Sequence, residues 1–459
     1  MAAAITIARK GFSVLVIEAR GTIGGGARSE ELTLPGFIHD TFSAVHPMAA
    51  ASPFFRGTPL EKYGLEWIQP AIPLAHPLES EAVVLERSVT ATAEKLGRRD
   101  GAAYRRLMEP LTRHWEAIFE DILRPMLHFP RHPIALARFG LPALLPARAL
   151  ANLQFSGERA RALFAGLAAH SFLPLDAAAS ASFGLVLGMA GHAVGWPIPK
   201  GGSQQISNAL GACLRESGGT IQVDRQIGNL RELPTARATL LDLTPRQIVR
   251  IAGERLPRGY REKLAKYRYG PGVFKLDYAL SEPIPWLAES CRRAGTIHLG
   301  GFLAQIAASE REVSKNRHPA EPFVLVSQPS LFDQTRAPEG GHVAWAYCHV
   351  PPGSSLNMTE RVERQIERYA PGFRGTILEK SALTTKNLEE RNANLVEGDI
   401  SGGSADLRQL LARPVFSRNP YRTPLRGLYI CSSSTPPGGG VHGMCGYNAA
   451  TAALREILS

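Results

Sequence analysis

Short apolar runs separated by glycine turns dominate the first thirty residues. Residues 2–8 (AAAITIA) predict a helix, residues 10–11 a turn, and residues 12–17 (FSVLVI) a buried strand that ends at Glu18. A helix and strand in this order are typical of the second half of a dinucleotide-binding βαβ unit, whose first strand and glycine-rich turn come earlier. Counting back from Glu18 places that turn before or across Met1. Without the first strand, neighbouring strands would keep an unpaired edge.

The central part of the chain changes between two patterns. Apolar positions at helical spacing run from about 89 to 123, and a helix is expected from Ser203 as N-cap to about 217. Runs rich in β-branched and aromatic residues predict strands of an antiparallel sheet. They are GVFKLDYAL, FVLVSQ and HVAWAYCHV. A helix is expected to begin at Asn357, and the chain finishes with the strand GLYICSS and a helix over about 447–458.

These elements predict an α/β protein with a discontinuous nucleotide-binding domain. Helix–strand units at both chain ends enclose a middle that is rich in long helices and antiparallel strands. We assign residues 1–48, 197–255 and 400–459 to the nucleotide-binding domain. Residues 49–196 and 256–399 form an inserted α+β domain.

Composition and charge narrow the function classes. The net charge is +11, from 52 Lys and Arg against 41 Asp and Glu, but the basic residues are spread along the chain, so we expect no nucleic-acid partner. The five scattered cysteines indicate reduced thiols and a cytoplasmic protein, and no secretory signal is recognised. Residues 177–199 lack charge, yet their glycines and prolines favour a buried helix and loop over a membrane span.

Two glycine-rich segments suit an anionic ligand. Glu18, at a strand end, is placed to accept hydrogen bonds from ribose hydroxyls, although it can equally be an ordinary surface acid. The loop that follows, GTIGGGARS, combines close backbone approach with the charge of Arg28. Near the C-terminus, Gly438, Gly440 and Gly443 satisfy G-x-G-x-x-G, but too few residues follow for a second strand. That loop instead directs a helix N-terminus at something anionic or electron-rich.

Three segments together resemble one protein family. VLVIEARGTIGGGAR, GWPIPKGGSQQISNAL and NPYRTPLRGLYICSSSTPPGGGVHGMCGYNAA are similar to segments of phytoene-desaturase-like proteins, a branch of the FAD-dependent amine-oxidase and carotenoid-desaturase superfamily. The resemblance covers essentially the whole chain. It implies a Rossmann-like FAD-binding domain of the glutathione-reductase type, below a substrate domain. The family's first strand and glycine turn are absent, and CSSS replaces its usual acidic or glycine residue.

The resemblance also implies a set of residues that bind FAD. Glu18 would bind the adenosine ribose, and the following loop would lie along the pyrophosphate and flavin. The strand near Val223 to Ile227 would approach the adenine, and the C-terminal loop would face the ribityl chain and ring. The complete set is Glu18, Ala19, Arg20, Gly25, Gly26, Ala27, Arg28, Val223, Ile227, Ser433, Ser434, Gly439, Gly440, Val441, His442, Gly443 and Met444.

Other polar and aromatic residues flank these motifs. His46 and His442 are the candidate catalytic residues, since both lie in loops beside glycine- or proline-rich turns. The candidate substrate-pocket residues are Trp196, Lys200, Trp345, Tyr347 and His349. Each of them is as readily explained by packing. His128 and His132 are four residues apart, but Pro130 between them argues against a metal pair, so we expect no metal.

The expected function is an FAD-dependent oxidoreductase of the phytoene dehydrogenase-like type. Flavin N5 would take hydride from a C–H of an apolar substrate, leaving a double bond. Oxygen, a quinone or a nicotinamide would then accept the electrons. Two alternatives remain open: a catalytically impaired or non-enzymatic truncated flavoprotein paralogue, and an FAD-dependent isomerase. An in-frame strand and G-x-G-x-x-G upstream of Met1 would identify a misplaced start.

One further stretch suits a membrane surface. Residues 123–150 mix apolar patches with arginine and proline, and predict short helices broken at the prolines. Such a segment could contact a bilayer peripherally and collect a lipophilic substrate. An ordinary helical cap on a core explains it equally well.

Overall fold

A seven-stranded sheet forms the centre of the larger half of the molecule in this computed structural model, which describes residues 1–79 and 81–458. Its strand order is β14-β10-β13-β12-β11-β5-β6. The strands are β14 (Ile377–Leu383), β10 (Gly272–Leu280), β13 (His342–Val350), β12 (Val324–Ser327), β11 (Ala294–Leu299), β5 (Ile72–Leu78) and β6 (Glu81–Leu85). All neighbours are antiparallel except β11 and β5, so the antiparallel sheet expected from the central strands is confirmed.

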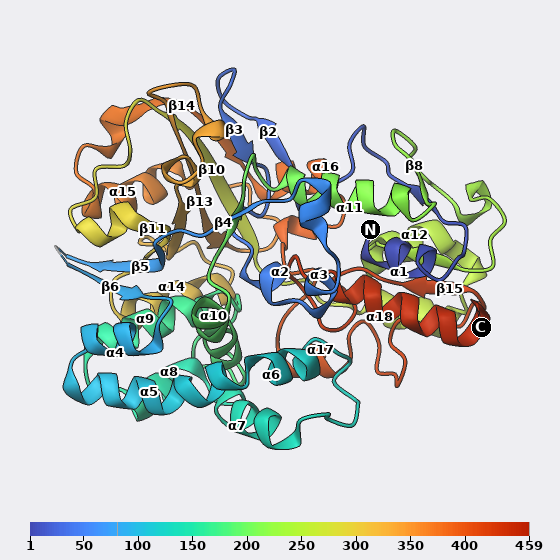
Figure 1. The fold of residues 1–459 in the computed structure, drawn as a ribbon, viewed down its shortest axis with the longest axis horizontal. Coiled ribbons are helices and arrows are strands. Elements are labelled where there is room, and N and C mark those ends of the chain that lie inside the picture. The colour runs from blue at the N-terminus through green and yellow to red at the C-terminus, as the bar shows by residue number, and fades with distance from the viewer. Residues whose placement is uncertain (80, 459) are drawn as a thin grey trace.

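Helices cover the two faces of this sheet (Figure 1). On one face, apolar side chains of α15 (Thr359–Tyr369) join a core with residues of β10, β11 and β13. On the other face lie α9 (Glu158–Ala169), α10 (Ala181–Ala193) and α14 (Leu303–Ser314). The buried faces of α9 and α10 belong to the largest core, which also takes in α5 (Arg98–Arg113) and α6 (Trp115–Ile122). Two separate apolar layers therefore hold the sheet.

The smaller half brings the two ends of the chain together (Figure 1). The parallel pairs β1 (Leu15–Ile17) with β8 (Thr220–Gln222), and β9 (Thr239–Leu241) with β15 (Leu428–Ile430), are its strands. Helix α1 (Ala2–Ala8) packs on both α18 (Met444–Ala453) and α11 (Gln204–Glu216). Within the described part of the chain, β1 and β9 each have one partner strand, so each keeps an unpaired edge, as the sequence predicted.

The remaining elements lie within these two halves or connect them. They are β2 (Ser29–Glu31), β3 (Ile38–Asp40), α2 (Pro47–Ala51), α3 (Pro53–Arg56), β4 (Trp67–Ile68), α4 (Val89–Lys95), α7 (Pro133–Ala143), α8 (Ala147–Gln154), β7 (Ile198–Pro199), α12 (Pro245–Ala252), α13 (Arg258–Ala265), α16 (Thr385–Arg391) and α17 (Leu407–Leu411). Helices α12 and α13, for example, pack in a core with β9 and β15. No single helix among the described residues is long and apolar enough to cross a membrane. Helices α7 and α8 pass that test only as a pair, bent by 99°.

Most predicted elements are present, with shifted ends. The strands at 272–280 and 342–350 and the helix at 2–8 are confirmed to the residue, and the charge-free stretch 177–199 holds the buried helix α10. The region 89–123 divides into α4, α5 and α6 because Gly97 and His114 have non-helical backbone angles. The strand expected over 12–17 covers only Leu15–Ile17.

Two predicted helix starts are wrong by two or three residues, and a third helix starts as predicted without the expected side-chain cap. The last helix begins at Met444 rather than 447, directly after Gly443, whose φ is +69°. The helix expected from Asn357 begins at Thr359, and the Asn357 side chain accepts a hydrogen bond from the Thr359 amide. Ser203 precedes α11 as expected, but its hydroxyl does not cap the helix. It donates to the Ser43 carbonyl at 2.6 Å instead.

Candidate functional site

One large cavity, with a volume of about 2090 Å³, runs between the two halves. At one end it is lined by the β1 strand, Glu18 and the glycine loop, and at the other by side chains of the seven-stranded sheet. The cavity is larger than the range of roughly 300–1,000 Å³ that is usual for a small-molecule pocket. It has room for a dinucleotide and a second ligand.

Glu18 and Arg28 form the polar end of the cavity. Glu18 follows β1, and its Oε1 accepts a hydrogen bond from the Arg20 amide at 2.9 Å. The Arg28 Nη2 lies 3.6 Å from that Oε1 and donates to the Thr22 carbonyl at 2.7 Å. The Arg28 side chain is buried, and its Nε has no hydrogen-bond partner among the described residues. A buried guanidinium with an unused donor suits an anionic ligand.

Two glycines leave open space beside Arg28. A Cβ built on Gly25 or Gly26 would meet no atom within 4 Å, and both residues line the cavity. The φ of Gly25 is +56°, which side chains rarely adopt. The backbone can therefore approach a ligand closely here, as the sequence predicted for this loop.

His442 fixes the C-terminal glycine loop. Its Nε2 lies 3.1 Å from the Gly438 carbonyl, and its Nδ1 accepts a hydrogen bond from the Met444 amide at 3.0 Å. The Nε2 therefore carries the proton, and both ring nitrogens are occupied. Burial lowers the pKa of His442 to about 4. His442 lines the cavity, but in this geometry it holds the loop and has no free nitrogen for proton transfer.

His46 is held in a similar way. Its Nε2 lies 2.8 Å from the Ser203 Oγ, and because that hydroxyl donates to Ser43, the imidazole is the donor. Burial lowers the pKa of His46 to about 4. His46 lines the cavity as a neutral imidazole.

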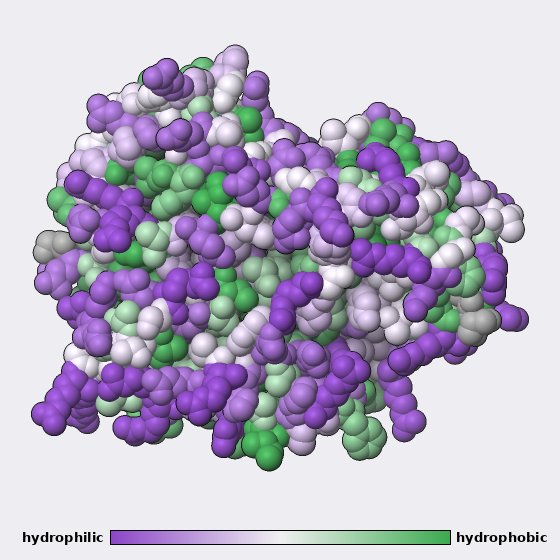
Figure 2. Space-filling model, in the orientation of Figure 1, coloured by the Kyte–Doolittle hydropathy of each residue, from purple (hydrophilic) through white to green (hydrophobic). Residues whose placement is uncertain are grey.

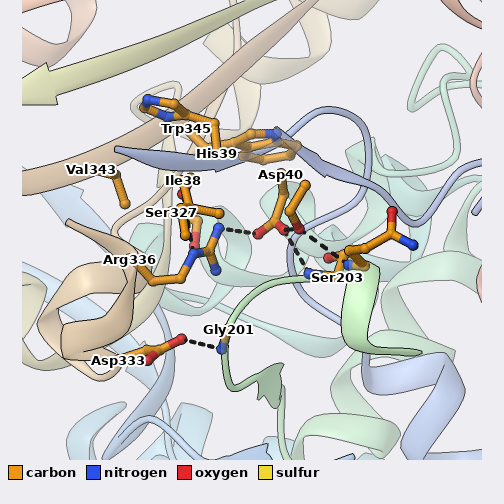
Figure 3. Close-up of polar contacts among 12 residues, drawn as sticks. Ile38, His39, Asp40, Gly201, Ser203, Ser327, Asp333, Arg336, Val343 and Trp345 are labelled. Carbon is orange, nitrogen blue, oxygen red and sulfur yellow. Dashed lines mark hydrogen bonds and ion pairs between the residues drawn. The ribbon is translucent and has the colours of Figure 1, made fainter. Parts of the chain in front are cut away.

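A buried ion pair fixes the loop before α11 (Figure 3). The Arg336 Nη2 lies 2.9 Å from the Asp40 Oδ2, and the Arg336 Nε donates to the Ile38 carbonyl. The Asp40 Oδ1 accepts from the Ser203 amide at 2.7 Å, and Asp333 accepts from the Gly201 amide at 2.7 Å. The motif GWPIPKGGS is thus tied to β3 on one side and to the segment after β12 on the other.

Sequence reasoning missed a charged pair on β10. Lys275 lines the cavity, donates to Asp277 two residues away, and lies 5.6 Å from the centre of the Trp345 ring. Burial lowers the pKa of Lys275, although Asp277 opposes this. Burial also raises the pKa of Asp277 to about 6, against the attraction of Lys275. The sequence GVFKLDYAL contains a signal for this pair. Lys275 and Asp277 are two residues apart and so lie on one face of a buried strand, and burying charged groups costs free energy unless they are paired.

Aromatic side chains line the cavity beside Lys275. Trp196, Trp345 and Tyr347 do so, as the sequence predicted, and the structure adds His170 and Phe172. The His170 Nε2 lies 2.9 Å from the His298 Nε2, and burial lowers the pKa of His170 to about 3. The aromatic side chains and the neutral His170 thus make this end of the cavity largely apolar, although Lys275, Thr296 and Arg391 also line it.

Most of the residues expected to bind a cofactor lie together around the cavity. They are Glu18, Ala19, Arg20, Gly25, Gly26, Ala27, Arg28, Ile227, Ser433, Gly439, Gly440, Val441, His442 and Gly443. Val223, Ser434 and Met444 do not line it. Val223 is exposed just beyond β8, the Ser434 hydroxyl donates to the Gly402 carbonyl, and Met444 is buried in the largest core.

Two expected pocket residues also lie away from the cavity. The Lys200 Nζ pairs with Glu66 at 2.9 Å on the surface. The His349 Nδ1 lies 2.8 Å from the Glu310 Oε2, and its ring is 4.0 Å from that of Phe172, centre to centre. His349 is therefore behind the cavity wall. Both residues were predicted from the motifs beside them in the sequence. His349 lies two residues after Tyr347 on β13, so both side chains are on the same face of the sheet, but His349 packs behind Phe172.

Comparison with known proteins identifies the family. The family described as flavin containing amine oxidoreductase matches residues 1–249, more than half of the chain. The chain belongs to this family of flavin-containing amine oxidoreductases. Its cofactor is FAD. The resemblance to phytoene-desaturase-like proteins is confirmed as well.

The chain matches its relatives over different shares of its length. The chain is 28% identical to mouse pyridine nucleotide-disulfide oxidoreductase domain-containing protein 2 over 57% of the chain and 52% of that protein, so it spans about half the length of this relative. Phytoene desaturase from Fusarium fujikuroi is 25% identical over 95% of the chain and 84% of that protein.

Solved structures show the same mixed α/β fold. An oxidoreductase from Methanosarcina mazei superposes with a TM-score of 0.67 at 15% identity, over 99% of this chain and 97% of its own. Putrescine oxidase superposes with a TM-score of 0.62 at 16% identity, over 100% and 96%.

The polar end of the cavity fits FAD. Glu18 offers a carboxylate to ribose hydroxyls, and the open space at Gly25 and Gly26 admits a pyrophosphate beside the unused donor of Arg28. The glycine loop at 438–443 leads into α18. The first amides of α18 carry a partial positive charge, and the first turn of this helix lines the cavity. The fit rests on residues from both ends of the chain.

Proposed function

We propose that this flavoprotein oxidises an apolar substrate by removing hydride from a C–H bond, in the manner of a desaturase. The observation that carries the proposal is the continuity of one cavity from Glu18 and Arg28 to an aromatic chamber of Trp196, Trp345 and Tyr347. Bound FAD supplies the two-electron acceptor. The substrate loses a hydride from one carbon and a proton from its neighbour, which leaves a double bond.

The chamber excludes water and orients the substrate. Its aromatic walls offer dispersion contacts, and the indole N–H groups of Trp196 and Trp345 already donate to backbone carbonyls. His46, His170 and His442 are neutral in this environment, so none adds charge to it. An extended hydrocarbon is therefore the substrate class that the walls favour. The proton is released to water where the cavity reaches the surface at Met126 and Leu144.

Lys275 places an ammonium group at the wall of the chamber. A positive charge in a dry site stabilises negative charge that develops during reduction. The Asp277 carboxylate accepts a hydrogen bond from Lys275 and opposes the lowering of the Lys275 pKa by burial. We assign to this pair an electrostatic role in flavin reduction.

The proposal includes the domain organisation. Residues 1–48, 197–255 and 400–459 would form a Rossmann-like FAD domain of the glutathione-reductase type, and residues 49–196 and 256–399 a substrate domain. The parallel pairs β1–β8 and β9–β15 and the packing of α1 on α18 support the first assignment. The seven-stranded sheet lies wholly in the second. We place the protein in the cytoplasm.

Anaerobic reduction tests the function. The purified protein should show flavin absorbance bands. Mixing it with a polyene or another long-chain hydrocarbon should bleach these bands and yield a product with two fewer hydrogen atoms than the substrate. Oxygen, a quinone and a nicotinamide, added separately, would identify the electron acceptor by restoring the bands. A flavin-loaded protein that changes none of these substrates contradicts the desaturase proposal. A product with unchanged hydrogen count would indicate the isomerase.

A further inference from the structure

Exposed hydrophobic side chains gather around α7. Seven of the seventeen large hydrophobic residues that are exposed in the described part of the chain fall within residues 126–153. We define the docking surface by six of them: Met126, Leu127, Phe129, Ile134, Leu141 and Leu144. The Phe129 side chain is 98% exposed. Hydrophobic groups protrude at the lower edge of the molecule in Figure 2, below the position of α7 in Figure 1. Such a cluster marks an interaction site.

The docking surface is also cationic. From Leu123 to Gly157 the sequence contains four arginines and no Asp or Glu. Arg131 approaches Glu120 at 3.7 Å, and Arg148 approaches Asp176 at 3.5 Å. Arg124 and Arg138 have no ion pair with any residue that the structure describes. Apolar side chains bordered by arginines match the interface of a bilayer with anionic headgroups.

The docking surface meets the cavity. Met126 and Leu144 are 52% and 56% exposed and also line the cavity wall. Behind them the wall continues through Leu136, Phe139 and Leu187 to the aromatic chamber. A mainly apolar wall, which also includes Asp121 and His128, thus joins the exposed cluster to the site of proposed chemistry.

We propose that residues 126–144 dock on an anionic lipid bilayer and admit a membrane-dissolved hydrocarbon substrate to the cavity. A second copy of the chain fits this surface less well, because both copies would present the same arginines and each carries a net charge of +11. The surface also adjoins the cavity, so a substrate dissolved in the bilayer could enter from it, whereas a contact between two copies would cover this opening. The substrate part of this inference rests on the proposed function, while the docking part stands on the surface alone.

Vesicle flotation tests the docking directly, without any turnover. The wild-type protein should float with phosphatidylcholine–phosphatidylglycerol vesicles at low salt and less at high salt, and bind weakly to pure phosphatidylcholine. Phe129→Asp with Ile134→Asp should weaken binding at least about ten-fold, since neither lines the cavity and both would insert. The matched control is Leu378→Asp on β14, which is 52% exposed and lies on the far sheet edge.

The outcomes separate the docking from the proposed chemistry. Unchanged flavin absorbance in the double variant shows that it is folded and loaded. Flotation that is lost in the double variant and kept in the control supports the inference. No flotation of the wild-type chain with anionic vesicles at either salt overturns it, whatever the activity. A wild-type dimer that the double variant dissociates, without vesicle binding, would instead make this surface a contact between copies.

Discussion

Arg336 and Asp40 form a fully buried ion pair, with the guanidinium Nη2 2.9 Å from the carboxylate Oδ2. The two residues are almost three hundred positions apart. Asp40 ends β3, and Arg336 lies in the loop between β12 and β13. The same carboxylate accepts from Ser29 and from the Ser203 amide. The pair therefore couples the inserted sheet to the loop that begins α11, next to His46.

Removing one partner of this pair should strongly destabilise the fold. Asp40→Asn leaves the Arg336 guanidinium buried without a counter-charge, and we expect a loss of about 3–5 kcal/mol in the free energy of unfolding. Urea denaturation of the purified variant measures it. Glu66→Gln, which removes the exposed partner of Lys200, should cost less than about 1 kcal/mol. Equal losses in both variants would contradict a special role for the buried pair.

The sequence could not predict this pair, because nothing local connects Asp40 with Arg336. Local patterns did predict the strands at 272–280 and 342–350, where β-branched and aromatic residues are continuous. They also predicted Glu18, the glycine loop and Arg28, which are contiguous in the chain and lie together in the cavity. Lys200 and His349 were wrongly predicted to line the substrate pocket, because a position next to a motif in the sequence does not determine the direction of the side chain.

Glu18 should contribute directly to FAD affinity. Glu18→Ala removes the carboxylate that faces the ribose end of the cavity, and we expect FAD binding to weaken by roughly ten- to a hundred-fold, the range for a hydrogen bond to a charged group. Titration of flavin-free protein with FAD, followed by fluorescence quenching, measures the dissociation constant. Glu254→Ala, on the exposed turn after α12, is the control. An unchanged dissociation constant for Glu18→Ala would mean that the ribose lies elsewhere.

Lys275 should raise the reduction potential of the flavin. Lys275→Met removes a positive charge from the chamber wall, so the reduced state should be less stable and the midpoint potential more negative. Spectroelectrochemical titration measures this without substrate. Lys95→Met, which removes an exposed lysine that pairs with Glu86, should leave the potential unchanged. A potential that is the same in Lys275→Met and wild type would remove Lys275 from the proposed mechanism.

Asp277 should give flavin reduction a dependence on pH near 6. Its pKa is raised to about 6, first by burial, so the carboxylate becomes neutral below that pH and the chamber wall gains net positive charge from Lys275. If this charge stabilises the reduced state, the rate constant of anaerobic flavin reduction should rise as the pH drops through 6. Stopped-flow absorbance across pH 5–8 would record the inflection, and Asp277→Asn should abolish it. An inflection that survives in Asp277→Asn must belong to another group.

Buried histidines should make the fold sensitive to acid. Burial lowers the pKa of His46, His76, His192 and His442 to about 4, below the value of about 6.5 that an unfolded histidine has. Between these values the unfolded chain binds more protons than the folded one, so stability is complete above pH 6.5 and falls as the pH drops toward 4.

Asp40 should act in the same direction at lower pH. Burial would raise its pKa, but Arg336 and the hydrogen bonds from Ser203 and Ser29 outweigh this and lower it. Its contribution is thus present above the pKa of an unfolded Asp and is lost in stronger acid.

Thermal unfolding tests the effect of the buried histidines. The midpoint of the wild-type protein should fall from pH 8 to pH 5. His192→Phe, which removes the hydrogen bond to the Tyr104 hydroxyl, should lower stability at pH 8 yet reduce the slope below pH 6.5. A midpoint that is flat from pH 7 to pH 5 would show that these imidazoles are accessible to solvent and not buried in neutral form.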